Sequence, residues 1–299
     1  MNISVSPDAA RAASAAFRTP SNADAIHTAA RQILSHIEAG QRVDANLLRA
    51  AMETAFGGSD ADGAWDWKSA YEACEAATVL FLRKIAPALR ARTLPNAQLP
   101  ILARIAVLLP THTRRSAESQ ALQQFSTPIA LGLAASAAAA LTSADLVLEP
   151  SAGTGLLAIL AELRGASLCL NEYADARAGL LELLFPSAHV YRFDAAQIHD
   201  RLDPSIAPSV VMMNPPFSAL AHVDRAMPDA AYRHVASALA RLRPGGRLVA
   251  ITGRVFRPTI RAGMARFRNC RSRERSFSPP PSTASSTPDR EPMSTRASR

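Results

Sequence analysis

The sequence predicts an α/β fold with a doubly wound, mostly parallel sheet. Short apolar segments alternate with helical patterns between residues 128 and 252, which is the order of strand and helix in such a sheet. A glycine-rich turn follows the first of these strands, and polar residues stand where four successive strands end. Because the carboxyl ends of parallel strands meet at one edge of a sheet, these residues should form one site.

The composition is that of a globular protein with a sizeable core, since 48% of the 299 residues are hydrophobic. The net charge is +8, which invites a nucleic-acid partner. Residues 254–299 hold eleven arginines and three acidic residues, so this segment carries the whole net charge. Any DNA affinity of the folded part must therefore come from a local patch.

The cysteines Cys74, Cys169 and Cys270 are far apart and lack the spacing of a zinc site or a disulfide framework. We therefore expect no metal and a reducing, cytoplasmic location. The longest uncharged run, residues 128–144, consists mostly of Ala, Ser and Gly and precedes a strand, so it predicts a soluble helix rather than a membrane span.

Residues 1–112 are predicted to form a helical module. Apolar residues recur at helical spacing from Ile26 to Ile37, Gly40 ends this helix, and Asp44 begins the next. A loop at residues 57–60 is followed by Trp65, Trp67 and another helix, and we expect the tryptophans to be core anchors rather than base-stacking residues. The function of this module is not readable from its residues.

The cofactor half of the site begins at the strand of residues 145–148. It continues into Glu-Pro-Ser-Ala-Gly-Thr-Gly at residues 149–155, and a helix is expected from about Leu156. Glycines let a backbone approach a ligand closely. The second strand, residues 166–170, is followed by Asn171 and Glu172, and an acid in this place suits ribose hydroxyls. The third strand, residues 189–193, ends at Asp194.

Dinucleotide sites share this geometry, so the turn must discriminate between ligands. The third glycine of a dinucleotide turn is replaced by Ala158, which such sites tolerate. The acidic residue Glu149 at the start of the turn favours a cationic ligand over a pyrophosphate.

The fourth strand, residues 209–213, runs directly into Asn214-Pro215-Pro216-Phe217. Two prolines donate no backbone hydrogen bond and make a stiff turn that displays its neighbours. The Asn214 amide and exposed carbonyls offer acceptors, and the Phe217 ring offers a stacking face. This pairing suits a planar substrate with an NH2 group, although prolines can also simply end a strand.

The tetrapeptide resembles the (Asp/Asn/Ser)-Pro-Pro-(Tyr/Phe) motif of S-adenosylmethionine (SAM)-dependent amino-group methyltransferases, including the DNA adenine-N6 enzymes. Residues 149–155 are similar to their SAM motif, and Phe125-Ser126-Thr127-Pro128 to an element that contacts SAM. Thr127 and Pro128 are also expected to be the cap and the first-turn proline of the helix that follows. Over residues 115–253 the segment order also resembles the methylase-like part ahead of the helicase-related region in bacterial strawberry-notch-like proteins. No helicase motif is present, so we expect this chain to be only a front portion.

The resemblance implies a Rossmann-like SAM-dependent methyltransferase sheet in residues 113–268. Its cofactor residues would be Phe125, Thr127, Pro128, Glu149, Ser151, Ala152, Gly153, Gly155, Glu172, Asp194 (toward the adenine of SAM) and Asn214. Its catalytic residues would be Asn214, Pro215, Pro216 and Phe217. DNA is the expected partner, with a flipped adenine stacked on Phe217. RNA, protein glutamine amides, and an inactive SAM- or DNA-binding module remain open.

The end of the chain departs from this pattern. After the fifth strand, residues 247–252, the family continues into two further strands, whereas residues 254–299 become rich in Arg, Ser and Pro. We expect a sheet truncated after the fifth strand and a disordered tail at residues 269–299. Its arginines should give weak, salt-sensitive and sequence-independent DNA binding.

Overall fold

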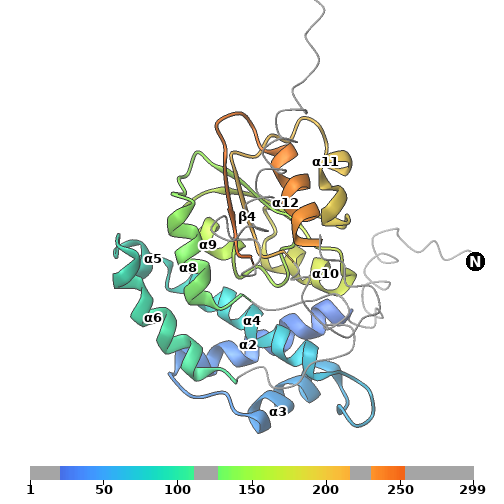
Figure 1. The fold of residues 1–299 in the computed structure, drawn as a ribbon. Coiled ribbons are helices and arrows are strands. Elements are labelled where there is room, and N and C mark those ends of the chain that lie inside the picture. Colours follow the sequence, from blue (N-terminus) through green and yellow to red (C-terminus); the bar gives the residue numbers. More distant parts are fainter. Residues whose placement is uncertain (1–20, 111–126, 216–229, 253–299) are drawn as a thin grey trace, which may run out of the picture.

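A computed structural model describes residues 21–110, 127–215 and 230–252, and contains one parallel sheet of five strands (Figure 1). The strands are β1 (Leu146–Glu149), β2 (Ser167–Asn171), β3 (His189–Tyr191), β4 (Val210–Met213) and β5 (Arg247–Ala250). Their order is β3-β2-β1-β4-β5, and every neighbouring pair is parallel. The predicted α/β, Rossmann-like sheet is confirmed, with strand ends shifted by one or two residues.

Helices cover both faces of the sheet, which explains why its central strands are apolar on both sides. On one face, α8 (Ile129–Ala138) and α9 (Ala158–Glu162) pack on Val147, Val210 and Met212. On the other face, α11 (Ile198–Arg201) and α12 (Ala230–Arg241) pack on Leu148, Val211 and Met213. The remaining short elements are the 3-10 helix η1 (Ala195–Gln197) and the helix α10 (Asp175–Leu184).

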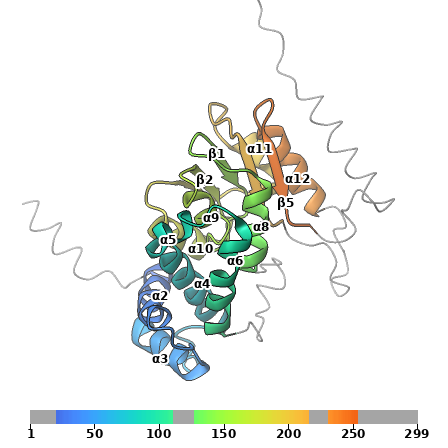
Figure 2. The same cartoon turned by 90° about the vertical axis from the view of Figure 1, so that its left-hand side faces the viewer.

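The N-terminal helices lie against the α9–α10 side of the sheet. They are α2 (Asn22–Glu38), α3 (Ala45–Phe56), α4 (Trp67–Lys84), α5 (Ala86–Arg90) and α6 (Pro95–Leu108). One hydrophobic core includes Ile33 of α2, Val79 of α4 and Leu181 of α10. Figure 2 shows α2 and α3 at one end of the molecule and β5 with α12 at the other. The predicted domain boundary at residues 112–113 lies outside the described residues, but the described helices and the sheet share a core.

Local signals placed these helices as the sequence predicted. The Ser21 hydroxyl and the Asp24 carboxylate form a reciprocal capping box at the start of α2. Asp44 caps α3 by accepting from two backbone N–H groups, and Gly57 ends that helix in the left-handed region. Trp65 is buried and donates to the Gly58 carbonyl at 3.0 Å, as expected of a core anchor.

In the described part of the chain no helix is long and apolar enough to span a membrane. No group of three potential metal ligands occurs within residues 21–110, 127–215 and 230–252. Burial raises the pKa of Cys74, and that of Cys169 to about 11, so both described thiols favour the protonated form. The cytoplasmic location stays a prediction.

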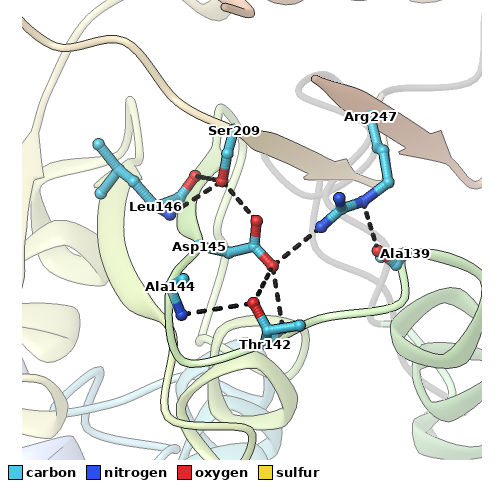
Figure 3. A network of polar contacts seen from close by, with 7 residues as sticks. All are labelled: Ala139, Thr142, Ala144, Asp145, Leu146, Ser209 and Arg247. Carbon is cyan, nitrogen blue, oxygen red and sulfur yellow. Dashed lines mark hydrogen bonds and ion pairs between the residues drawn. The ribbon is translucent and has the colours of Figure 1, made fainter. Parts of the chain in front are cut away.

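At the amino end of the sheet, Asp145 joins three strands through one carboxylate (Figure 3). It accepts from Ser209 Oγ before β4 at 2.7 Å and from Arg247 of β5 at 2.9 Å. The Thr142 N–H and hydroxyl donate to the same carboxylate. Burial acts to raise the pKa of Asp145, but the hydrogen bonds and the Arg247 charge outweigh it and lower the pKa to about 2.

We expect Asp145→Asn to lower the free energy of unfolding at pH 7 by about 2 kcal/mol, since it removes charged hydrogen bonds from a buried site. The unfolded pKa of Asp is about 3.9. The folded value is lower, so this contribution is complete above that pKa and disappears as the pH falls through about 2. Urea unfolding of both proteins across this range measures it.

The matched control is Glu38→Gln, which breaks the more exposed ion pair to Lys84 and should cost well under about 1 kcal/mol. Equal losses in the two variants would contradict the special role given to Asp145.

Candidate functional site

The site lies where the strand order reverses, between β1 and β4. In the sheet β1 is flanked by β2 and β4, and its chain connection runs to β2. In open α/β sheets such a reversal leaves a crevice outside the carboxyl ends of the strands. The turn of residues 150–155, called here the glycine turn, leaves β1 at this edge, and Asn214 follows β4 at the same edge. The glycine turn and Asn214 therefore lie at the same edge of the sheet, at the switch point.

Asn171, the last residue of β2, holds the neighbouring strand ends together and is fully buried. Its side-chain N–H2 group donates to the carbonyls of Pro150 at 2.8 Å and Phe193 at 2.9 Å. Its side-chain oxygen accepts from the Phe193 N–H at 2.8 Å, and its backbone carbonyl accepts from Ala152 at 2.9 Å. One amide thus links the chain ends of β1, β2 and β3. The sequence pattern alone does not indicate this role of Asn171.

Glu172 is engaged by the protein's own backbone. Its Oε2 accepts from the Gly153 N–H at 2.8 Å, and its Oε1 accepts from the Ala174 N–H at 3.0 Å. Each carboxylate oxygen keeps a further lone pair. Glu172 therefore orients the glycine turn and can still accept from a ligand hydroxyl.

The two glycines of the turn differ in what requires them. Both have positive φ, 57° at Gly153 and 85° at Gly155. A Cβ on Gly155 would lie 2.3 Å from the Phe185 ring, so core packing excludes a side chain there. A Cβ on Gly153 would meet no atom within 4 Å, so Gly153 is the glycine at which a ligand can approach the backbone.

The N–H groups of both glycines in the turn are already used, which matters for anion binding. The Gly153 N–H is bonded to Glu172, and the Gly155 N–H donates to the Ala152 carbonyl at 2.9 Å. A pyrophosphate depends on free N–H groups at such a turn. Ser151 is half-buried beside these residues and Ala152 is buried.

Glu149 ends β1 and is only 2% exposed, and its Oε2 has no hydrogen-bond partner among the described residues. Burial, and then the nearby charge of Glu172, raise its pKa well above the ordinary value. The sequence alone predicts that Glu149 is permanently ionised. In the structure its carboxyl group retains a proton more readily, and a neighbouring cation would favour its ionised form.

Asn214 contacts Thr127 across 87 residues of sequence. The Asn214 side-chain N–H2 group donates to the Thr127 hydroxyl at 3.0 Å. The Asn214 side-chain oxygen is buried and unpaired within the described residues. Thr127 was expected to cap the following helix, but α8 shows no side-chain cap and Pro128 occupies the cap position. Thr127 instead sets the orientation of the Asn214 amide.

Asp194 lies three residues after β3, because this strand ends at Tyr191 rather than at residue 193 as predicted. Its carboxylate is exposed and caps η1 by accepting from the Ala196 N–H at 2.9 Å. Its contact with adenine stays a prediction. Nearby, His234 of α12 is half-buried with Nδ1 unpartnered in the part of the chain described. Burial lowers the pKa of His234 despite the Asp194 charge.

Part of the predicted site lies outside the described residues: Phe125, Pro216, Phe217 and the arginine-rich tail. Pro215 is described and buried. Tyr173, which was not among the predicted site residues, follows Glu172 and is 65% exposed. Its position directly after a strand-end acid was the available signal.

A second constellation has the residue types of a hydrolase triad. Ser237 Oγ lies 2.8 Å from His199 Nδ1, and His199 Nε2 lies 3.2 Å from Asp200. A hydrolase triad needs an accessible serine and a buried carboxylate. Here Ser237 is only 4% exposed, whereas the Asp200 side chain is 72% exposed. Ser237 also accepts from the His199 backbone N–H, so these residues join α11 to α12.

No family model matches this chain, and no curated protein matches it. Solved structures with partial similarity include TrmN from Thermus thermophilus, with 23% identity over 48% of this chain and 44% of that chain and a TM-score of 0.37. A putative RNA methyltransferase from Pyrococcus horikoshii gives 20% identity over 58% and 79%, with a TM-score of 0.40. The mitomycin 7-O-methyltransferase MmcR gives 18% identity over 82% and 81%, with a TM-score of 0.30. Similarity at this level assigns no activity to this chain.

We expect Asn171→Ala to lower the free energy of unfolding by about 2–4 kcal/mol, because it leaves several buried backbone groups without partners. Urea unfolding measures the loss. Asn46→Ala, at an exposed helical position, is the control and should change stability by less than about 0.5 kcal/mol. A near-neutral Asn171→Ala would show that the strand ends are held by other contacts.

Proposed function

We propose that this protein is a SAM-dependent methyltransferase that modifies an exocyclic amino group, most directly adenine N6 in DNA. One observation carries the proposal: at the switch point the Gly153 N–H is satisfied by Glu172, while buried acceptor atoms of Glu149 and Asn214 have no partner in the described structure. A site with spare acceptors, in which the N–H groups of both glycines are occupied, suits a cationic ligand rich in donors.

A dinucleotide is the main alternative ligand for this geometry. Its pyrophosphate would have to compete with Glu172 for the Gly153 N–H and would lie beside that carboxylate. SAM carries no phosphate. Its ammonium, ribose hydroxyl and adenine amino groups are donors, and its sulfonium is a cation. The charge and hydrogen-bonding capacity of the turn therefore favour SAM.

The residues that would hold SAM follow from this chemistry. Gly153 lets the ligand approach the backbone, Glu172 has lone pairs left for hydroxyl groups, and Glu149 can ionise beside a cation. Tyr173 offers an exposed ring next to Glu172. When bound, SAM supplies an activated methyl group.

The acceptor half supports an amino-group substrate. Thr127 holds the donor side of the Asn214 amide, so the Asn214 oxygen is left to accept from an NH2 group. Such an acceptor localises the lone pair on the amino nitrogen and stabilises the positive charge that develops there. In the proposed mechanism the Pro215 carbonyl is a second acceptor for the amino group, and the substrate base stacks on the Phe217 ring. No general base is needed before transfer, because the proton can leave afterwards.

The remaining candidate functions differ in the class of molecule that accepts the methyl group. RNA amino groups and protein glutamine amides present the same NH2 chemistry as adenine, and an inactive SAM- or DNA-binding module would keep the cofactor half alone. Transfer from labelled SAM to defined DNA, RNA and peptide acceptors separates these cases. DNA methylation at adenine N6 is the outcome that we expect.

We expect purified protein to bind SAM more tightly as the pH rises. Burial raises the pKa of Glu149, and a bound cation favours the ionised form, so binding releases a proton. Below the pKa of the free protein the affinity should rise by up to about tenfold per pH unit and then level off. Calorimetry across pH, and in buffers of different ionisation enthalpy, measures both effects.

Glu149→Gln should bind SAM with little pH dependence. NADH binding without SAM binding would overturn the cofactor assignment. A pH dependence that persists in Glu149→Gln would place the proton on another group.

Asn214→Ala should lower methyl transfer by about 10²-fold or more while SAM affinity changes little, since the amide oxygen is assigned to the acceptor. Single-turnover transfer and calorimetry are the measurements. Asn214→Asp keeps an acceptor oxygen and should retain more activity than Asn214→Ala. Full activity in Asn214→Ala would mean that the Asn-Pro-Pro-Phe turn only ends the strand.

A further inference from the structure

The glycine turn is contacted by a side chain from the N-terminal helices. Thr154, between the two glycines, is buried, and its hydroxyl donates to the carboxylate of Glu75 in α4. Glu75 is itself buried and lies 79 residues earlier in the chain. Buried polar groups are costly unless paired, so this contact fixes where Thr154 can lie.

The same face of α4 carries a second buried carboxylate. Glu72, one helical turn before Glu75, pairs with Arg177 of α10 at 2.6 Å. Burial raises the pKa of Glu72 although the Arg177 charge opposes this. Arg177 is also within electrostatic reach of Glu172 and Glu75. The ion pair holds this face of α4 against α10, beside the residues that contact the turn.

The glycine turn is therefore held from two directions at adjacent residues. Glu172 accepts from the Gly153 N–H, and Glu75 accepts from the Thr154 hydroxyl. Glycines on both sides of Thr154 give the backbone more conformations than other residues would allow. Side-chain bonds from outside the turn must select one of these conformations.

We propose that Glu75 is a positioning residue for the cofactor turn: through Thr154 it holds Gly153 in the conformation that leaves the backbone open to the ligand. This inference rests on the proposed function for its ligand. It gives the N-terminal helices a role in the site, because α4 supplies the hydrogen-bond partner of Thr154, the residue that follows Gly153.

A purely structural contact between the same parts of the molecule provides a matched control. Arg83 of α4 forms a two-point ion pair, at 2.6 and 2.9 Å, with Glu162, the last residue of α9 and seven residues after the glycine turn. Glu162→Gln should reduce the attachment of α4 to α9 without affecting the turn.

The experiment compares Thr154→Val with Thr154→Ser, which keeps the hydroxyl. Two quantities are measured: hydrogen exchange of the backbone amides in residues 152–156, and SAM affinity by calorimetry. Thr154→Val should speed exchange and weaken SAM binding, each by about tenfold, as expected for one lost hydrogen bond to a charged group. Thr154→Ser and Glu162→Gln should match the unmodified protein in both measurements.

Glu75→Gln is the second variant and serves if Thr154→Val does not fold. It keeps an acceptor oxygen but loses the charge, so it should show smaller changes in the same direction. Unchanged hydrogen exchange in the variant that folds would overturn the positioning role, whatever the SAM affinity of that variant. Faster exchange in a protein whose unmodified form binds no SAM would support the positioning of the turn and refute the proposed function.

Discussion

The hydrogen bonds of the Asn171 side chain are the constraint on which the rest of the site depends. One buried amide joins the chain segments that leave β1, β2 and β3, and it does so through backbone groups rather than side chains. The glycine turn, Glu172 and Asp194 all follow directly from these segments. Their relative positions are therefore set by a residue that need not contact a ligand.

The opposite end of the sheet has a comparable device built from charge. Asp145 holds β1, β4 and β5 at their amino ends through Ser209 and Arg247. Asp145 therefore fixes the spacing of β1 and β4 at their amino ends, opposite the switch point. The site is thus formed by rigid strand ends, and its ligand chemistry comes from the loops that follow them.

The electrostatics of the site favour a cation beside an uncharged acceptor. Glu172 accepts from the Gly153 N–H, which a phosphate would need as a donor. Glu149 is buried, and a positive charge beside it would promote its ionisation. Asn214 presents an amide oxygen whose orientation is set by Thr127. These features support the proposed sulfonium-bearing methyl donor and the proposed amino-group acceptor, and they differ from the requirements of hydride transfer with a dinucleotide.

The sequence by itself determined the parallel α/β sheet, the glycine turn and the placement of Glu172 and Asn214 at strand ends, because hydrophobic periodicity and turn residues are local signals. It assigned Thr127 to a helix cap and Glu149 to a fixed charge, and both assignments depended on neighbours that lie far away in sequence. Only the tertiary structure decided that Thr127 orients Asn214, that burial raises the pKa of Glu149, and that Glu75 from the N-terminal helices contacts Thr154. The physical reason is that burial and pairing are properties of packed segments, and residues 79 or 87 positions apart carry no local signal of their contact.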